Sequence, residues 1–327
     1  MEKNFTEIEQ LKKEKILLTG ITGFVGANLA HTLLDAGIQV YAIKRKKSNL
    51  WRLKGIAHKI KFYDADLNNR ELVQDILKDI DPAIVIHLAI YGGYPYQQDV
   101  RNIFESNLFG TINILGAFLQ TKGRLFINTG TSSEYGIKNM PMCETDFLEP
   151  VNDYGISKAA AAMYCQKESK ITNKSVVTLR LFSAYGYLED HSRLFPSIIQ
   201  SLLNDKIPSL ASPKYVRDFC FIDDIIRAYI KVICFQDQKR INGEIFNVSS
   251  GKQYSVENVL NLICDIMGKT HKALWGKEAL RNNEPGFWQA DVTKAKKVLN
   301  WESIVSMEEG LRLYIEWFKK NKNMYEN

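Results

Sequence analysis

Short apolar runs alternate with segments of helical periodicity through the first half of the chain. The runs are rich in β-branched residues and have the length of buried strands, and the segments between them are long enough to serve as crossover helices. This alternation predicts an α/β fold with a doubly wound parallel sheet. The predicted strands span residues 16–19, 38–43, 59–63, 84–88, 125–129 and 175–181, and the predicted helices span residues 24–36, 70–80, 103–120 and 154–169.

The pattern changes beyond about residue 184, where short strands and separate helices are punctuated by Pro196, Pro208 and Pro213. We therefore predict two unequal parts, a parallel-sheet domain over residues 1–183 and a smaller C-terminal α/β lobe over residues 184–327. Later segments around residues 219–247 are expected to return to the first domain.

The composition is that of an ordinary globular protein, with 327 residues of which 45% are hydrophobic and 24% charged. A net charge of +6 is small for a protein that binds nucleic acid through bulk charge. Residues 1–18 mix Glu and Lys where a signal peptide needs an apolar run, and no stretch reaches the roughly 18 apolar residues of a membrane span. The cysteines and histidines are dispersed, so we expect a cytoplasmic protein without a disulfide framework or a metal site.

A glycine-rich loop occupies residues 20–26, directly after the first predicted strand and at the start of the first predicted helix. Small residues there permit a tight turn, let a diphosphate approach the backbone, and leave the N–H groups of a helix start to bind its charge. The loop predicts a Rossmann-type dinucleotide-binding domain. The residues expected to contact the dinucleotide are Gly20, Thr22, Gly23, Phe24, Val25 and Gly26.

The second predicted strand ends in a basic run instead of the carboxylate that usually binds the ribose hydroxyl of NAD. Between residues 41 and 63 the chain has eight Lys or Arg and no Asp or Glu, so the excess positive charge is concentrated there. Lys44 and Arg45 would attract a 2′-phosphate, which favours NADP(H) while NAD(H) stays open. The alternative is a solvated basic loop without a ligand. Asp66, followed by Leu67, could reach the adenine or instead cap the next helix.

Tyr154 and Lys158 are four residues apart on a predicted helix and therefore share one of its faces. A phenol with an ordinary pKa of about 10 is a poor proton shuttle, and a neighbouring cation is expected to lower that pKa. Tyr154 could then exchange a proton with a carbonyl or hydroxyl oxygen while a nicotinamide transfers hydride at carbon.

A cluster of Ser and Thr side chains ends the fifth predicted strand, at the carboxyl edge of the sheet where ligands of open α/β sheets bind. A hydroxyl from this cluster, residues 129–133, can hydrogen-bond the reacting oxygen of a substrate and hold it near Tyr154. Alternatively, some of these side chains satisfy backbone groups in a turn.

From about residue 15 to residue 313 the sequence resembles the extended short-chain dehydrogenase/reductases that act on nucleotide sugars. The resemblance implies that Thr131 is the catalytic hydroxyl, Tyr154 the acid and base, and Lys158 the ribose-binding cation. It rests on several separate motifs, which are Thr-Gly-x-x-Gly-Phe-x-Gly at residues 19–26, His-Leu-Ala at 87–89, Asn-x-x-Gly-Thr at 107–111, and further motifs at 180–186, 217–224, 243–248 and 290–295.

The same resemblance assigns further contacts on both sides of the site. The additional cofactor contacts that it implies are Leu88, Ala89, Asn107 and Phe182. The substrate contacts that it implies are Ser132, Ser133, Ser183, Arg193 and Arg217.

Arg217 is expected to contact the diphosphate of the substrate, because a guanidinium suits a diphosphate by charge and by bidentate geometry. A structural salt bridge to Asp223 or Asp224 is the alternative. The implied partners are a nucleotide-diphosphate sugar and a second copy of the chain, which would form a homodimer through helices 103–120 and 154–169.

Departures from the family pattern bear on the reaction. Ser132 and Ser133 stand where sugar 4,6-dehydratases carry acids, which disfavours loss of water, although Glu134 keeps that alternative open if the alignment shifts by one residue. Ser133 also replaces the Cys of reductases that epimerise two carbons, and Arg193 stands at the position of their His.

We therefore expect an NADPH-dependent enzyme that reduces a nucleotide-linked 4-keto-6-deoxy sugar at C4. A nucleotide-sugar 4-epimerase, with the same three catalytic residues and no net cofactor turnover, is the first alternative, and a 4,6-dehydratase is the second. A non-catalytic dinucleotide sensor belongs to a different class, and such proteins commonly lose the Tyr or Lys that this chain keeps.

Overall fold

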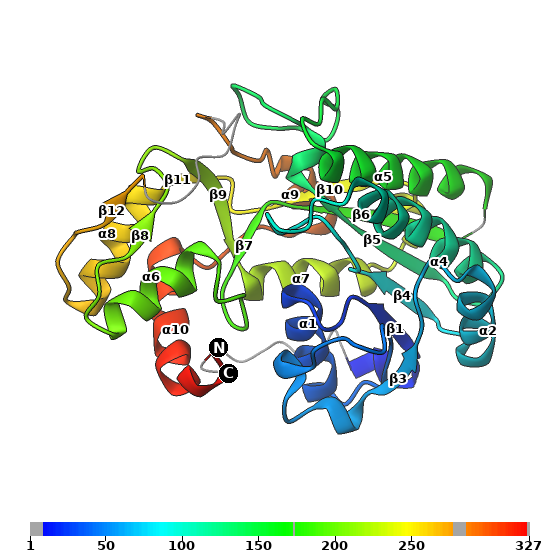
Figure 1. The fold of residues 1–327 in the computed structure, drawn as a ribbon. Coiled ribbons are helices and arrows are strands. Elements are labelled where there is room, and N and C mark those ends of the chain that lie inside the picture. The colour runs from blue at the N-terminus through cyan, green and yellow to red at the C-terminus, as the bar shows by residue number, and fades with distance from the viewer. Residues whose placement is uncertain (1–8, 173, 277–285, 326–327) are drawn as a thin grey trace.

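The structure, a computed structural model, describes residues 9–172, 174–276 and 286–325. Over these ranges seven strands form one parallel sheet in the order β10-β6-β5-β4-β1-β2-β3 (Figure 1), which confirms the predicted doubly wound α/β class. The strands are β1 (Ile16–Thr19), β2 (Val40–Lys44), β3 (Lys61–Asp64), β4 (Ile84–His87), β5 (Leu125–Thr131), β6 (Ser175–Leu181) and β10 (Ile245–Val248).

The six strands predicted in the first half of the chain all form, each within two residues of its predicted bounds. Most are buried on both faces because helices cover both sides of the sheet. In β1, Ile16 and Leu18 pack into the core on one face, and Leu17 packs into the core on the other. A continuous apolar run is what such a doubly covered strand requires.

Helices α1 and α7 cover one face of the sheet, and α2, α4 and α5 cover the other (Figure 1). The predicted helix over residues 103–120 is divided, since a π-helical turn at Glu105–Phe109 separates α3 from α4. The helices are α1 (Phe24–Asp35), α2 (Arg70–Ile80), α3 (Val100–Phe104), α4 (Gly110–Leu119), α5 (Asp153–Ile171) and α7 (Ile222–Ile233).

A smaller lobe begins where β6 ends. After Phe182 the chain enters β7, which pairs in parallel with β9. The described part of the lobe holds a three-stranded sheet of order β11-β9-β7 and a two-stranded sheet of β12 and β8. Its elements are β7 (Ser183–Tyr185), β8 (Ser209–Leu210), β9 (Val216–Phe221), β11 (Gln253–Ser255), β12 (Leu274–Trp275), α6 (Leu194–Leu203), α8 (Val256–Met267) and α10 (Met307–Lys320).

The chain rejoins the large sheet after β9. Helix α7 packs against α1, and β10 pairs in parallel with β6 as the outermost strand on that side. Although it is an edge strand, β10 is buried, and α9 (Thr293–Leu299) packs against it. Among the described residues none of the helices has both the length and the apolar character needed to cross a bilayer.

Buried contacts fix the lobe against the glycine loop. Arg52, in the 3₁₀ turn Trp51–Leu53, is 7% exposed, and it donates from Nε to the Leu188 carbonyl at 2.7 Å and from Nη1 to the Thr22 carbonyl at 3.2 Å. The Trp51 ring meets Tyr325 edge to face, with 5.5 Å between centroids. Further 3₁₀ turns lie at Glu9–Lys13, Ala57–Lys59, Ser132–Glu134, Gln238–Ile241 and Lys322–Tyr325.

Candidate active site

A cavity of about 1480 Å³ lies between the carboxyl ends of the parallel strands and the lobe. Open α/β sheets bind their ligands at this edge. Two predicted site residues, Asn107 and Lys158, lie behind the wall of the cavity. The predicted residues that line it are Gly20, Thr22, Gly23, Phe24, Val25, Gly26, Lys44, Arg45, Asp66, Leu67, Leu88, Ala89, Thr131, Ser132, Ser133, Tyr154, Phe182, Ser183, Arg193 and Arg217.

The glycine loop has the geometry of a diphosphate site. Gly20 has φ +69°, and a Cβ there would lie 2.5 Å from the Ala89 backbone nitrogen. A Cβ on Gly26 would lie 2.4 Å from the Gly20 carbonyl oxygen, so the turn closes only without side chains. Gly23 precedes α1 and provides no side-chain cap, which leaves the N–H groups of the first turn for an anion. These residues fit a dinucleotide.

The basic residues that end and follow β2 make different contacts. Lys44 pairs with Asp64 of β3 at 2.5 Å, and the buried Arg52 turns to backbone carbonyls. Lys44 and Arg52 therefore bind other groups of the protein. The prediction that the basic run binds a phosphorylated cofactor is limited to the remaining basic residues of the run. Arg45, Lys46 and Lys47 are exposed, and they border a hollow of about 550 Å³ with Ser48, Asp64, Ala65, Asp66 and Leu72.

Asp66 does not cap α2, so the alternative role considered for it is wrong. The cap is Asn69, whose side chain accepts from the Leu72 backbone N–H. Asp66 accepts from the Asn68 backbone N–H at 2.9 Å and lines both the cavity and the hollow.

Tyr154 and Lys158 lie in the first two turns of α5, whose N-cap Asn152 accepts from the Gly155 N–H at 2.8 Å. Burial raises the pKa of Tyr154 to about 12, while hydrogen bonding with Thr131 and the charge of Arg193 act in the opposite direction. The expectation that a neighbouring cation lowers the pKa of this phenol is wrong for the protein alone, because desolvation by burial raises that pKa more than Thr131 and Arg193 lower it. Tyr154 is therefore a neutral proton donor at ordinary pH.

Lys158 is a buried cation whose ammonium has no hydrogen-bond partner among the described residues. Its side chain is 1% exposed, and burial lowers the pKa of Lys158. Buried polar groups are nearly always hydrogen-bonded, so this unpaired donor fits a ligand hydroxyl such as that of a ribose.

Asn107 holds the wall of the cavity and does not line it. The side chain, in the π-helical turn, is fully buried and bonds both the N–H and the carbonyl of Tyr91 at 2.8 Å. Its Nδ2 also donates to Ser157 Oγ at 3.0 Å. The prediction of a direct cofactor contact is therefore corrected, since Asn107 ties the loop after β4 to α5. Interrupted helices of this kind are frequent at functional sites.

Glu134 is locked in a buried ion pair. It is fully buried, and its Oε2 lies 2.7 Å from Nη2 of Arg180, which is 1% exposed. Its Oε1 accepts from the Thr131 backbone N–H at 2.8 Å and so holds the turn after β5, residues 131–134, in place. Glu134 does not line the cavity, and the dehydratase alternative that depends on it stays a prediction.

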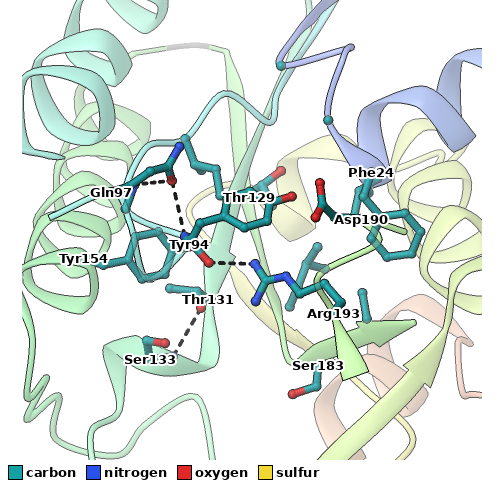
Figure 2. A pocket seen from close by; sticks show the side chains of 18 of the residues that line it. Phe24, Tyr94, Gln97, Thr129, Thr131, Ser133, Tyr154, Ser183, Asp190 and Arg193 are labelled. Carbon is teal, nitrogen blue, oxygen red and sulfur yellow. Dashed lines mark hydrogen bonds between the residues drawn. The ribbon is translucent and has the colours of Figure 1, made fainter. Parts of the chain in front are cut away.

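The loop after β4 and the start of α6 also line the cavity, and Figure 2 shows Tyr94 and Gln97 of this loop beside Tyr154. Arg193 donates to the Gly93 carbonyl at 2.6 Å, and its guanidinium lies 4.4 Å from the centroid of the Tyr94 ring. Figure 2 shows Tyr154 and Thr131 on one side of the cavity, with Asp190 and Phe24 toward the other. The loop after β4 and the lobe thus meet across the site.

Arg217 and Ser132 approach each other through Trp288. The Arg217 guanidinium lies 5.3 Å from the Trp288 ring centroid and donates to its neighbour's carbonyl, that of Val216. The indole N–H of Trp288 donates to Ser132 Oγ at 3.2 Å. Asp224, a proposed ion-pair partner of Arg217, instead binds Arg227 at 2.5 Å.

Several residues that line the cavity could not be predicted from the sequence. Tyr94, Gln97, Glu189, Asp190 and Trp288 all line the cavity, yet none lies in a recognised motif. The one local signal is the aromatic, glycine-containing stretch after His-Leu-Ala, residues 91–96. The described residues contain no group of three His, Cys, Asp or Glu side chains that could hold a metal ion.

A family model described as the NAD dependent epimerase/dehydratase family matches residues 16–249. The chain belongs to this family. Its resemblance to the nucleotide-sugar group of the extended short-chain dehydrogenase/reductases is thereby confirmed.

Relatives within the family match almost the whole length of the chain. It is 28% identical over 320 residues to a UDP-glucuronate 4-epimerase of Thermodesulfobacterium geofontis, covering 93% of this chain and 96% of that protein. A UDP-glucuronic acid decarboxylase of Xenopus tropicalis is 24% identical, over 98% of this chain and 77% of its own. The UDP-glucuronic acid 4-epimerase of Bacillus cereus, solved with UDP-glucuronic acid and NAD, is 27% identical with a TM-score of 0.81, over 94% of this chain and 99% of its own.

Proposed function

We propose that the protein interconverts nucleotide-diphosphate sugars that differ in configuration at C4. The observation that carries this proposal is the arrangement around Thr131, where Tyr154 shares the cavity with the glycine loop while Glu134 is locked to Arg180. A site of this kind can oxidise and reduce one carbon, while the acid that contacts the Thr131 backbone, Glu134, is held by Arg180 and does not line the cavity. The relatives named above support epimerisation ahead of the C4 reduction that the sequence favoured.

The residues divide the chemistry between them. Tyr154, neutral in the protein alone, donates a proton to a C4 carbonyl oxygen and takes one from the C4 hydroxyl in the reverse step. Thr131 hydrogen-bonds the same oxygen and the phenol, and Lys158 binds the ribose of the dinucleotide. A dinucleotide held by the glycine loop and Lys158 would supply a nicotinamide able to take a hydride from C4 and return it to the opposite face of that carbon. Arg217 binds the diphosphate, with Ser132, Ser133, Ser183 and Arg193 around the sugar.

A homodimer forms part of the proposal. Apolar side chains on the outer surface of the π-helical turn and of α5 support it, because exposed large apolar groups that gather on one face are typical of interfaces. Phe109 is 53% exposed, Ile156 42% and Met163 56%.

If the protein is an epimerase, we propose NAD(H) as the cofactor, because the dinucleotide that is reduced in one step is re-oxidised in the next. A reductase would use NADP(H). The exposed Arg45, Lys46 and Lys47 beside their hollow favour a 2′-phosphate and keep the C4 reductase as a second candidate. Such an enzyme would consume free NADPH with a nucleotide-linked 4-keto-6-deoxy sugar.

The test begins with the purified protein and no added cofactor. Its bound dinucleotide is released and identified by mass spectrometry, and the protein is then given UDP-glucose, UDP-glucuronate and their dTDP counterparts. We expect C4 epimers to form without net change of nicotinamide absorbance. Consumption of NADPH with a ketosugar nucleotide would favour the reductase, and neither product nor consumption with any of these compounds would overturn both.

A further inference from the structure

Trp288 links the turn after β5, which carries the proposed catalytic Thr131, to the lobe. Its indole N–H donates to Ser132 Oγ at 3.2 Å, and both residues line the cavity. Ser132 directly follows Thr131 at the end of β5, whereas Trp288 comes from the lobe segment that precedes α9. Two parts of the chain that are 156 residues apart thus meet at the position of the substrate.

The position of Trp288 is fixed on both sides. Its backbone N–H donates to Gln253 Oε1 at 2.9 Å, and the next residues along the chain bond Met142 and Asp218. The side chain is 9% exposed and packs in a small core with Tyr135, Met142, Phe182 and Ala290. An indole held in this way presents its N–H in one direction.

This contact decides how Ser132 can bind a ligand. An indole N–H is a donor and never an acceptor, so Ser132 Oγ accepts from it and keeps its own proton to donate. Among the described residues the Ser132 hydroxyl proton has no hydrogen-bond acceptor. Ser132 therefore offers a donor to an acceptor oxygen of the sugar.

The face of the same ring bears the Arg217 guanidinium at 5.3 Å. A cation over an indole face is attracted by the negative potential of the ring, which restrains the guanidinium toward the cavity. One side chain thus contacts both the proposed diphosphate ligand and the neighbour of the catalytic threonine.

We propose that Trp288 is a positioning residue that aligns Ser132 with the sugar and Arg217 with the diphosphate of one substrate. The inference rests on the proposed function for the identity of that substrate. It predicts that the edge of the indole contributes to binding of the sugar and that its face contributes separately to binding of the diphosphate.

The edge is tested by a double-mutant cycle of Trp288→Phe and Ser132→Ala. Trp288→Phe keeps an aromatic face and loses the N–H. We expect kcat, and the ratio of UDP-glucose affinity to UDP affinity, to fall about tenfold. The affinity for UDP itself should change less than twofold. In the Ser132→Ala background the same change has no further effect. Losses that multiply in the double variant would overturn the inference.

The face is tested with Trp288→Leu, for which calorimetry should show UDP binding weakened about fivefold to tenfold. Trp317→Leu, in the aromatic cluster at the C-terminus and outside the cavity lining, is the matched control and leaves both readouts unchanged. Thermal unfolding of each variant separates loss of fold from loss of alignment. Unchanged UDP affinity in Trp288→Leu would contradict the role of the ring face.

The binding readouts do not depend on turnover. A wild-type protein that binds UDP-glucose more tightly than UDP but produces no epimer would contradict the proposed reaction and leave the cycle measurable. An active wild-type protein with an unaltered Trp288→Phe variant would contradict this inference alone.

Discussion

The two halves of the cavity are built by different means. The loop at residues 20–26 takes its shape from close backbone contacts, such as the space beside Gly26 that a Cβ would fill. The turn after β5 takes its shape from buried polar side chains of distant elements, since Glu134 holds the Thr131 N–H only while Arg180 neutralises it. The glycine loop depends on the absence of side chains within one short stretch of sequence. The turn after β5 depends on side-chain partners that are distant in sequence.

The largest expected effect is on chemistry without loss of fold. Tyr154→Phe removes the proton donor of the catalytic half, and we expect kcat to fall by about 10²–10⁴. Tyr164→Phe, on the same helix and outside the cavity lining, is the control that keeps full activity. Turnover is measured beside dinucleotide binding, which Tyr154→Phe should retain. A dinucleotide sensor would instead keep its function in this variant.

The stability of the turn after β5 should depend on the ion pair between Glu134 and Arg180. Arg180→Met leaves Glu134 as an unpaired buried charge, which is expected to lower the free energy of unfolding by about 3–5 kcal/mol. Urea unfolding measures this loss. The double variant Glu134→Leu with Arg180→Met should recover most of it, because an apolar pair carries no buried charge. Equal instability of the single and double variants would contradict the account.

The glycine loop should respond in cofactor affinity more than in global stability. Gly26→Ala places a Cβ against the backbone of the loop, and the strain of about 1–3 kcal/mol corresponds to dinucleotide binding weakened by about 5–150-fold. Gly116→Ala in α4, where a Cβ meets nothing within 4 Å, is the matched control and should be neutral or slightly stabilising. Dinucleotide titration and urea unfolding distinguish the two outcomes.

The pH dependence of stability tests Glu189, a buried acid that lacks the partner Glu134 has. Burial raises the pKa of Glu189 to about 8, and its Oε2 has no hydrogen-bond partner among the described residues. The folded pKa lies above the ordinary value of 4.5, so stability is full at low pH and is lost as pH rises toward 8. The slope is about 1.4 kcal/mol per pH unit over that range. Glu189→Gln should reduce the slope of the free energy of unfolding against pH, measured by urea unfolding between pH 5 and pH 8. An unchanged slope would show that another group causes the pH dependence.

The parts of the molecule that depend on local pattern could be predicted. Doubly buried strands give continuous apolar runs, and the turn at Gly20 and Gly26 requires glycine whatever surrounds it. The spacing of Tyr154 and Lys158 placed them in the first turns of one helix.

The rest depends on contacts between distant residues. The pairing of Lys44 with Asp64 follows from the adjacency of β2 and β3, and the raised pKa of Tyr154 follows from how deeply α5 is covered. Trp288 reaches Ser132 only because the lobe folds back over the end of β5. No short stretch of sequence contains these relations.

The buried outer strand β10 has a consequence for synthesis. Strands β1 to β6 have all left the ribosome once residue 181 has emerged, but the free side of β6 then waits for residues 245–248. At ordinary elongation rates the intervening chain takes about 3–13 s to make. During that interval the nascent chain exposes an unpaired strand edge, the feature that recruits chaperones or neighbouring chains. Completion of the dinucleotide-binding sheet is thus a late event on the ribosome, although most of it is encoded first.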